Sequence, residues 1–193
     1  MTSGARAVGV ADSYRPGSAR STLAAAVVRA DRAVDGLTFS SLSVGGTDAT
    51  DRLVSLLRRL GRPDARPVLV AGIAPAWYNV VDLSRVAAAA DRPVVSVSFE
   101  PSDGLVGPLR EAFSGGALAT RLATYERQPP RRAVTLADDR VWVRAAGCSS
   151  GTADRLVREF TPEGGRPEPL RVARLAARAG DAIPDRSGDD RDG

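Results

Sequence analysis

The first 44 residues alternate between short apolar runs and polar turns, which is typical of consecutive strands joined by hairpins. The apolar runs predict three strands, over residues 6–12, 22–28 and 33–44. Leu37 and Phe39 alternate with polar residues in the third, which indicates a strand covered on one face. Because the connecting segments are short, the three strands are expected to pair in order as an antiparallel meander.

The pattern changes after Gly45-Gly46, where apolar residues begin to recur at helical spacing. A helix is predicted over residues 49–60, and Gly61 with Pro63 ends it. Further along the chain the pattern predicts strands over 68–73 and 93–99, and helices over 83–90 and 106–126, the last interrupted at Gly115-Gly116. Strands that alternate with helices pair in parallel, so the order predicts an α/β fold with a mixed sheet of five strands flanked by helices.

The remaining residues predict a small carboxy-terminal extension. Its elements are a hairpin over 133–136 and 141–143 and helices over 152–160 and 169–179. Arg171, Arg174 and Arg178 share one face of the second helix by their spacing, which favours a solvated face over a phosphate track. The predicted organisation is a main domain over residues 1–130, residues 131–183 packed on that domain, and a disordered tail over 184–193 that has nothing to bury.

Composition restricts the class of protein. No stretch of the 193 residues approaches the roughly 20 consecutive apolar residues that cross a bilayer, and residues 1–17 lack the pattern of a signal peptide. A cytoplasmic protein without a membrane partner is therefore expected. Cys148 is the single cysteine, which excludes an internal disulfide and a thiolate zinc site and predicts a buried or turn residue.

The sequence contains neither His nor Lys, so all 27 cationic side chains are Arg. This excludes sites that depend on imidazole or on a lysine amine, including Ser-His-Asp triads, Walker phosphate loops and histidine metal centres. Carboxylate, hydroxyl, guanidinium and backbone groups remain, so a bound metal would be an oxygen-held Mg²⁺ or Mn²⁺. The net charge of +4 permits contact with phosphate, although exclusive use of Arg also fits a compositional bias of the genome.

One loop carries most of the candidate chemistry. Residues 67–83 read PVLVAGIAPAWYNVVDL, a buried strand followed by a wide loop, and α/β proteins place ligands at the carboxyl ends of such strands. Trp77 and Tyr78 of this loop have the rings needed to stack on a base extruded from a duplex, while the alternative is that they cover the following helix. We expect one ring to be packed and the other to be available.

Four stretches resemble a known family: GVADSYRPGSARSTLAAAVVRADRAVDG (9–36), VGGTDAT (44–50), AGIAPAWYNVVDL (71–83) and RPVVSVSFEP (92–101). Together they look like endonuclease dU, an archaeal family that is itself similar to endonuclease V, a metal-dependent repair nuclease acting at deaminated bases. The resemblance implies a ribonuclease H-like fold. It also implies a hydrolase that uses Mg²⁺ or Mn²⁺ and has nucleic acid, with DNA expected, as its partner.

The metal site of the family transfers incompletely. The position of the first-strand carboxylate is Ala11, with Asp12 displaced by one residue, and a neighbouring residue on a strand points to the opposite face. The position of a second carboxylate is Ala71. Asp48 is the counterpart of the acidic residue near the first helix, where a helix N-cap is the alternative. The resemblance therefore implies a site that is either rebuilt from other residues or catalytically lost.

A rebuilt site would take Asp12, Asp48 and Asp82 as catalytic metal ligands. Asn79 and Asp35 are further oxygen donors that could join them. Asp82 has the alternative role of capping the helix at 83, and the favoured alternative for Asp35-Gly36 is a bulge or turn. The other candidates would contact nucleic acid, and they are Arg15, Arg20, Trp77, Tyr78 and Asn79.

Three functions follow from these residues. The first is metal-dependent phosphodiester hydrolysis at deaminated bases, with deoxyuridine in DNA as the expected substrate. The second is a degenerate family member that binds nucleic acid without cleaving it, since stacking and Arg contacts do not need a metal. The third is a protein-interaction module, which predicts no salt-dependent affinity for nucleic acid.

Overall fold

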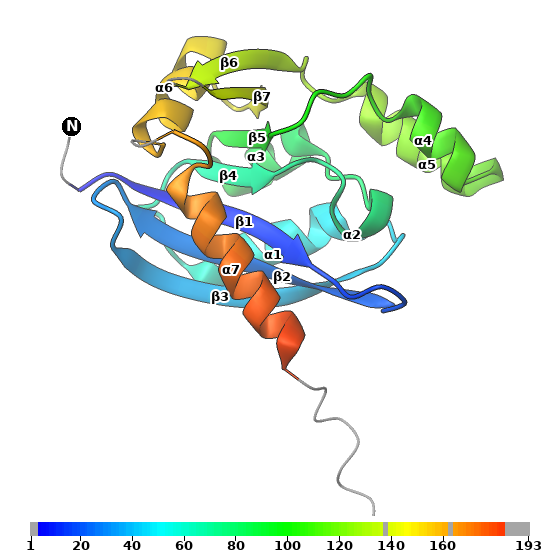
Figure 1. Cartoon of the computed structure of the whole chain (residues 1–193), viewed down its shortest axis with the longest axis horizontal. Coiled ribbons are helices and arrows are strands. Elements are labelled where there is room, and N and C mark those ends of the chain that lie inside the picture. Colours follow the sequence, from blue (N-terminus) through cyan, green and yellow to red (C-terminus); the bar gives the residue numbers. More distant parts are fainter. Residues whose placement is uncertain (1–3, 137–138, 162–163, 184–193) are drawn as a thin grey trace, which may run out of the picture.

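The computed structural model of the chain describes residues 4–136, 139–161 and 164–183 (Figure 1). The tail predicted over 184–193 lies outside these residues. The strands form one sheet of seven. From one edge to the other they are β3 (Val34–Ser43), β2 (Arg20–Arg29), β1 (Arg6–Ser13), β4 (Val68–Ala71), β5 (Val94–Ser98), β7 (Asp139–Ala146) and β6 (Arg132–Leu136).

The pairing confirms the order of the first five strands. β1, β2 and β3 form the predicted antiparallel meander, and β4 and β5 run parallel to β1. The prediction of a five-stranded sheet was wrong, because the predicted hairpin, β6 and β7, joins the same sheet and makes it one of seven strands. β7 pairs antiparallel with β5, with Ser98 opposite Trp142. The predicted extension is therefore part of the main sheet.

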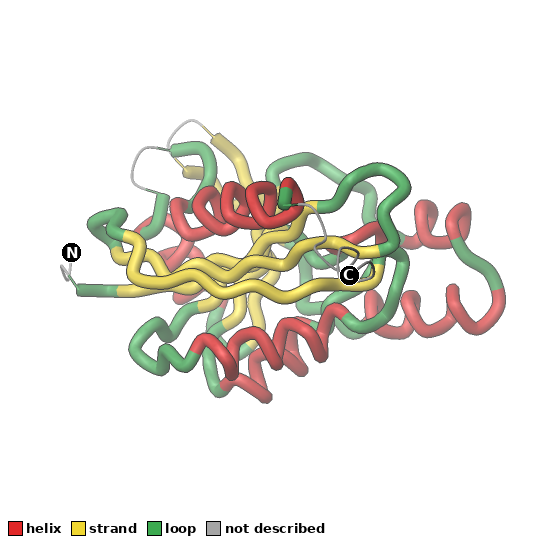
Figure 2. The backbone as a smooth tube through the Cα atoms, turned by 90° about the horizontal axis from the view of Figure 1, so that it is seen from below, coloured by secondary structure: helices red, strands yellow, loops and turns green. Residues whose placement is uncertain are grey.

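Helices cover both faces of the sheet, and Figure 2 shows the strands between two helical layers. α1 (Ala49–Leu60) and α3 (Leu83–Ala90) lie over one face, where their buried leucines pack on β1 and β4. α7 (Glu168–Ala182) crosses β1 and β2 on the opposite face. The remaining helices are α4 (Val106–Ala112) and α5 (Gly115–Glu126), which pack together at one end of the molecule, and α6 (Ser150–Glu159), which contacts β7.

Small residues of β1 allow α7 to lie close to the sheet. A Cβ atom added to Gly9 would be 1.9 Å from the carbonyl oxygen of Pro169, so only glycine fits there. Ala11 is 3% exposed and belongs to the same buried cluster as Ala173 of α7. Because side chains alternate along a strand, Val8 and Val10 point to the other face and pack in the core below α1 and α3.

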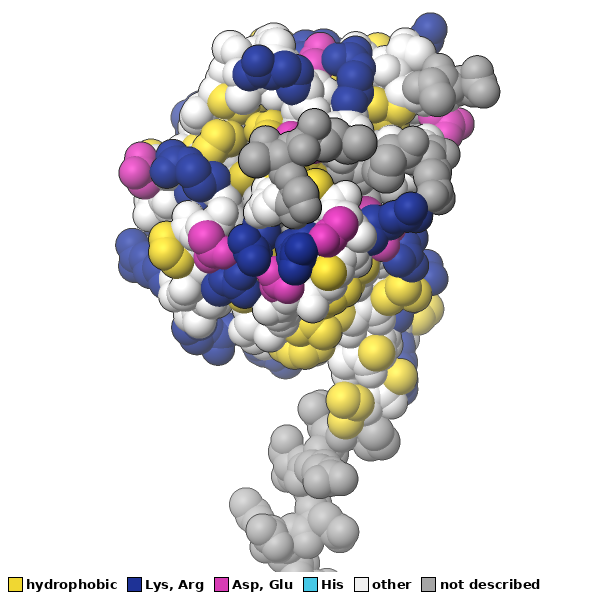
Figure 3. All heavy atoms as spheres, turned by 90° about the vertical axis from the view of Figure 1, so that its left-hand side faces the viewer, with side chains coloured by type: hydrophobic (Ala, Val, Ile, Leu, Met, Phe, Trp, Pro, Cys, Tyr) yellow, Lys and Arg dark blue, Asp and Glu magenta, His cyan; other side chains and the backbone are white. Residues whose placement is uncertain are grey.

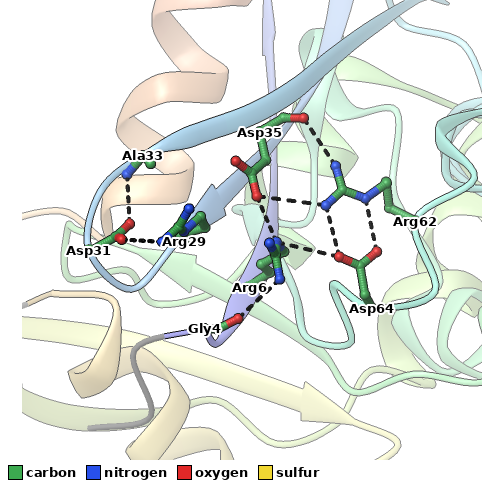
Figure 4. A network of polar contacts seen from close by, with 8 residues as sticks. All are labelled: Gly4, Arg6, Arg29, Asp31, Ala33, Asp35, Arg62 and Asp64. Atoms are coloured by element: carbon green, nitrogen blue, oxygen red, sulfur yellow. Dashed lines mark hydrogen bonds and ion pairs between the residues drawn. The ribbon is translucent and has the colours of Figure 1, made fainter.

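A network of ion pairs joins β1, β3 and the turn after α1 at the amino-terminal end of β1 (Figure 4). Asp35 is the extra residue of a β-bulge, as predicted, because Val27 pairs with Gly36 while Val28 pairs with Val34. Its Oδ2 accepts a hydrogen bond of 2.6 Å from Arg6 Nε. On this side of the molecule Arg and acidic side chains are interspersed (Figure 3), which is the composition of an ordinary solvated surface.

The second half of the network joins the side chains of Arg62 and Asp64. Two parallel hydrogen bonds of 2.9 and 2.8 Å connect the guanidinium to the carboxylate. Arg62 and, less strongly, Arg6 lower the pKa of Asp64 to about 2.

No helix in the described part of the chain is long and apolar enough to cross a membrane.

Candidate functional site

The carboxyl ends of β1, β4 and β5 open into a pocket of about 730 Å³. Parallel strands end on the same edge of a sheet, and the chain leaves both β4 and β5 in loops that form the pocket walls. The antiparallel strand β7 adds the side chains of Trp142 and Arg144. The side chains with polar or aromatic groups in the lining are Asp12, Tyr14, Trp77, Tyr78, Ser96, Ser98, Phe99, Glu100, Ser102, Tyr125, Arg131, Trp142, Arg144, Arg166 and Arg174.

The wall next to β4 is a strained segment, residues 74–79, which we call the aromatic loop. Its α2 turn (Pro75–Tyr78) is not regular helix, because Ala76, Trp77 and Tyr78 have φ angles of 46°, 56° and 61°. Left-handed backbone costs a residue other than glycine roughly 1–3 kcal/mol. Three such residues in a row persist only where surrounding contacts hold them.

Three segments distant in the sequence hold the aromatic loop. The carboxylate of Asp12 accepts a hydrogen bond of 2.9 Å from the Ala76 amide. The Gly45 amide donates to the Ala76 carbonyl at 2.7 Å, and Arg121 Nε donates to the Tyr78 carbonyl at 3.2 Å. Gly45 also leaves room for the Trp77 ring, since an added Cβ would be 2.8 Å from Trp77 Cε3.

Arg121 is the most unusual of these contacts, because it is 4% exposed and has no carboxylate partner among the described residues. Its guanidinium donates to the carbonyls of Gly45 and Gly46 as well as to that of Tyr78, and it lies 3.8 Å over the ring of Phe113. Burial lowers the pKa of Arg121. One cation of α5 thus connects the aromatic loop to the loop between β3 and α1.

Asp12 lies in the pocket wall, but protein groups already use its carboxylate. Oδ2 accepts from Ser21 Oγ at 2.9 Å in addition to the Ala76 amide. Ser21 Oγ also lies 3.1 Å from the Ser13 carbonyl, so the hydroxyl keeps an acceptor if Asp12 is removed. The observed role of Asp12 is to hold the aromatic loop.

Asp48 and Asn79 form a second, partly buried hydrogen-bonded group. Asp48 does not cap α1, and its oxygens accept from Asn79 Nδ2 at 2.6 Å and from the Ser43 amide at 3.2 Å. Asn79 is completely buried, and its Oδ1 accepts from the Ala49 amide, so it takes the place of the cap. Burial would raise the pKa of Asp48, but hydrogen bonds from Asn79, Ser43 and Arg52 outweigh it and lower the pKa.

Asp82 caps α3, which was the alternative to a role as metal ligand. Its Oδ1 accepts a hydrogen bond of 3.0 Å from the Arg85 amide in the first turn of α3. Its Oδ2 forms an ion pair of 3.4 Å with Arg127, and the residue lines a separate cavity of about 220 Å³. Asp82 is therefore not among the residues of the main pocket.

The residues present do not fit a divalent metal ion. In residues 4–136, 139–161 and 164–183, no three Asp, Glu or Cys side chains gather where they could hold one. Asp12 accepts two hydrogen bonds, Asp48 is bonded to Asn79 and Ser43, and Asp82 caps α3. Ala71 lines the pocket without an oxygen ligand in its side chain. The structure does not bring the three expected ligands together.

The cations of the pocket differ from those expected. Arg15 pairs with Asp181 at 3.8 Å and Arg20 donates to Ser41 Oγ, and neither lines the pocket. The pocket instead contains four arginines from the second half of the chain, which sequence reasoning missed: Arg131, Arg144, Arg166 and Arg174. The spacing of Arg174 and Arg178 was a signal, but it favoured a solvated face.

The aromatic rings divide between exposed and covered positions. Trp77 is 46% exposed, while Tyr78 is half-buried. The ring of Trp77 packs against Phe113, with centroids 5.1 Å apart, which fixes its orientation beside the pocket. On the opposite wall Arg131 lies 5.0 Å over the ring of Trp142. The site thus offers an oriented indole and several guanidinium groups around one cavity.

A family model and individual relatives both place this chain in one protein family. A family model described as Endonuclease dU matches residues 3–180. A UPF0215 protein of Thermococcus kodakarensis is 31% identical over 162 residues, covering 83% of this chain and 81% of the relative. A UPF0215 protein of Pyrobaculum aerophilum is 30% identical over 171 residues, covering 88% and 91%.

Solved structures show the same architecture. A protein of unknown function from Archaeoglobus fulgidus has a TM-score of 0.80 at 25% identity, covering 93% of this chain and 99% of that one. Ciona intestinalis endonuclease V in complex with a 24mer DNA containing an inosine has a TM-score of 0.63 at 14% identity, covering 93% and 87%. Human ENDOV has a TM-score of 0.61 at 16% identity, covering 93% and 85%. The likeness to the two endonuclease V proteins is one of fold.

Proposed function

Because this chain belongs to the endonuclease dU family, we propose that it acts on nucleic acid, and that it binds an unpaired nucleotide in the pocket without metal-dependent cleavage. The observation that carries this proposal is the content of the pocket. Four arginines and an exposed indole line it, whereas no group of three carboxylates forms in the described part of the chain. Binding by stacking and by guanidinium contacts needs no metal.

The size and chemistry of the pocket support a nucleotide as its occupant. Its volume of about 730 Å³ lies within the range of small-ligand sites, roughly 300–1,000 Å³. The Trp77 ring provides a stacking surface for a base, and Arg131, Arg144, Arg166 and Arg174 provide donors for phosphate oxygens. The strained aromatic loop keeps the indole in place before the ligand arrives, which lowers the entropy cost of binding.

The fold assignment that accompanies this proposal is ribonuclease H-like. A three-stranded antiparallel meander followed by parallel strands and intervening helices supports it. We further propose that residues 131–183 fold as one unit with residues 1–130, since β7 pairs with β5 and α7 packs on β1.

Metal-dependent hydrolysis at deaminated bases, with deoxyuridine in DNA as the expected substrate, is the second candidate. One observation favours it: Asp12 lies in the pocket wall. For cleavage, however, Asp12 would have to exchange its hydrogen bond from the Ala76 amide for another partner. The two candidates differ in their response to metal and in the effect of Asp12.

Purified protein is incubated with end-labelled single- and double-stranded DNA and RNA that contain uracil, hypoxanthine or only normal bases. Binding is measured by fluorescence anisotropy and cleavage on denaturing gels, each with Mg²⁺, Mn²⁺ or EDTA. We expect single strands to bind equally well in EDTA and to remain intact. Cleavage that requires a metal and disappears in Asp12→Asn would establish the second candidate, whereas absence of binding to every nucleic acid would refute both.

The proposed stacking of a base on Trp77 is tested separately with two variants of this residue. Trp77→Ala should weaken binding of a single strand by about 5- to 150-fold, which corresponds to the roughly 1–3 kcal/mol of one base stacked on an aromatic ring. Trp77→Phe keeps a π-face and should recover most of the affinity. Equal affinities of the parent and Trp77→Ala would place the base elsewhere in the pocket.

A further inference from the structure

Three cationic side chains extend from the pocket along the last helix, and we call Arg166, Arg174 and Arg178 the α7 arginine row. Arg166 lies just before α7 and lines the pocket together with Arg174. Arg178 follows Arg174 by four residues, so both project from the same face of α7, about 6 Å apart along its axis. All three are exposed.

None of the three forms a hydrogen bond or ion pair with another described residue, although Asp and Glu are common in this chain. Arg171 on the same helix is different, because its Nε donates to Glu168 Oε2 at 2.7 Å and its Nη2 to Oε1 at 2.5 Å. Arg166 lies 4.0 Å over the ring of Phe99, which holds its guanidinium at the pocket rim. The row is therefore a set of exposed donors without acceptors in the described part of the chain, and Phe99 orients the first of them.

The charges of the row act on one another. Partial desolvation of the guanidinium, followed by the positive charges of Arg174 and Arg178, lowers the pKa of Arg166, while Glu100 opposes this effect. Like charges held close together without a counter-ion repel, and a bound anion removes the repulsion. Guanidinium groups bind phosphate oxygens through two parallel hydrogen bonds, and a nucleic-acid strand presents phosphates in succession, as the row presents its cations.

We propose that the α7 arginine row binds consecutive phosphates of a nucleic-acid strand whose unpaired base occupies the pocket. This inference rests on the proposed function and adds the path of the strand: it leaves the pocket past Arg166 and Arg174 and continues along α7 to Arg178. Contacts of this kind position the strand without reading its sequence. The row should therefore set affinity and salt dependence, and leave base preference unchanged.

The test compares two triple variants of the full chain. Arg166→Gln/Arg174→Gln/Arg178→Gln removes the row, and Arg58→Gln/Arg155→Gln/Arg171→Gln removes three exposed arginines outside the pocket. Both lower the net charge of +4 by three, so a non-specific effect of charge is the same in each. The probe is a labelled oligothymidylate of about 16 nucleotides, followed by anisotropy between roughly 50 and 200 mM salt.

Each phosphate contact on a single strand contributes roughly −0.7 to the slope of log K against log salt concentration. The row variant should therefore lose about 2 from the magnitude of the parent slope, while the control triple changes much less, and Arg174→Gln alone should lose about 0.7. A row variant with the slope and affinity of the control triple overturns the inference and leaves the proposed function standing. If the parent binds no oligonucleotide, both fall together.

A polyglutamate of similar length decides the class of anion. We expect it to compete weakly, and equally against the parent and the row variant. Tighter binding of polyglutamate than of oligothymidylate, lost on removal of the row, would assign the row to an acidic peptide and overturn the phosphate inference. The melting temperature of the row variant should equal that of the parent, because its three side chains are exposed and form no ion pair with another described residue.

Discussion

Arg121 offers the sharpest test of how the pocket is held, and the perturbation is Arg121→Met. Methionine fills most of the buried volume but removes the donors to the carbonyls of Tyr78, Gly45 and Gly46. These carbonyls come from two loops, and the same guanidinium lies over the ring of Phe113, which packs against Trp77 and Tyr78. The substitution should therefore release the aromatic loop from α5.

The magnitude follows from opposing contributions. Three hydrogen bonds from a charged donor contribute roughly 1.5–3 kcal/mol each. Against this, the variant no longer buries a cation, which costs the parent several kcal/mol. We expect a net loss of about 3 kcal/mol in the free energy of unfolding, or roughly 6–12 °C in melting temperature for a chain of this size. Arg121→Lys retains the charge without the fork and should lose about half as much.

The assay combines thermal unfolding with tryptophan emission in a Trp142→Phe background, where Trp77 is the remaining indole. Release of the loop should shift the Trp77 emission to longer wavelength in the folded state and weaken oligonucleotide binding. An unchanged melting temperature would show that the buried guanidinium contributes no net stability. A lower melting temperature with unchanged emission and binding would refute the idea that Arg121 positions the aromatic loop.

Three further predictions concern carboxylates. Asp12→Ala should lower the free energy of unfolding by about 1.5–3 kcal/mol, because the Ala76 amide loses a charged acceptor, and Asp12→Asn should lower it by less. Urea titrations measure both, and equal stability of the parent and the two variants would contradict the prediction. The pKa of Asp64 is about 2 in the folded state, below the ordinary value of 3.8, so its contribution to stability is complete above about pH 3.8 and is lost as the pH falls toward 2. The melting temperature of Asp64→Asn, measured across this range, should lack this component of the acid slope. Ala11→Asp buries a carboxylate against α7 and should lower the free energy of unfolding by about 3–5 kcal/mol, whereas the Asp side chain of Ala71→Asp would face the open pocket and should be tolerated. Similar melting temperatures for the two variants would show that the packing of α7 adapts to a buried carboxylate.

The sequence was sufficient for features that depend on neighbouring residues. The meander, the helix over 49–60 and the capping alternative for Asp82 follow from local periodicity and from residue types at helix ends. The bulge at Asp35-Gly36 belongs to the same group. The sequence did not predict that the β6–β7 hairpin joins the main sheet. This pairing is not determined by neighbouring residues, because β5, the partner of β7, lies more than 30 residues earlier in the chain.

The geometry of the pocket depends on contacts that no local pattern contains. Left-handed backbone is normally signalled by glycine or asparagine, but at Ala76, Trp77 and Tyr78 it is maintained by Asp12 and Arg121, which are distant in sequence. The arginines show the same limit. With 27 of them in the chain, periodicity indicates which share a helix face, while ion pairing in the folded protein decides which remain available to a ligand.

The closeness of α7 to β1 also determines when the molecule can complete its fold. β1 leaves the ribosome long before the helix that covers one of its faces, since that helix consists of residues 168–182. At roughly 5–20 residues per second, the glycine and alanine stripe of β1 and β2 waits on the order of 10–30 s for its cover. The nascent chain therefore carries an exposed, uncharged sheet face while the residues between β2 and α7 are made, and a stop codon before residue 168 should yield an aggregating product.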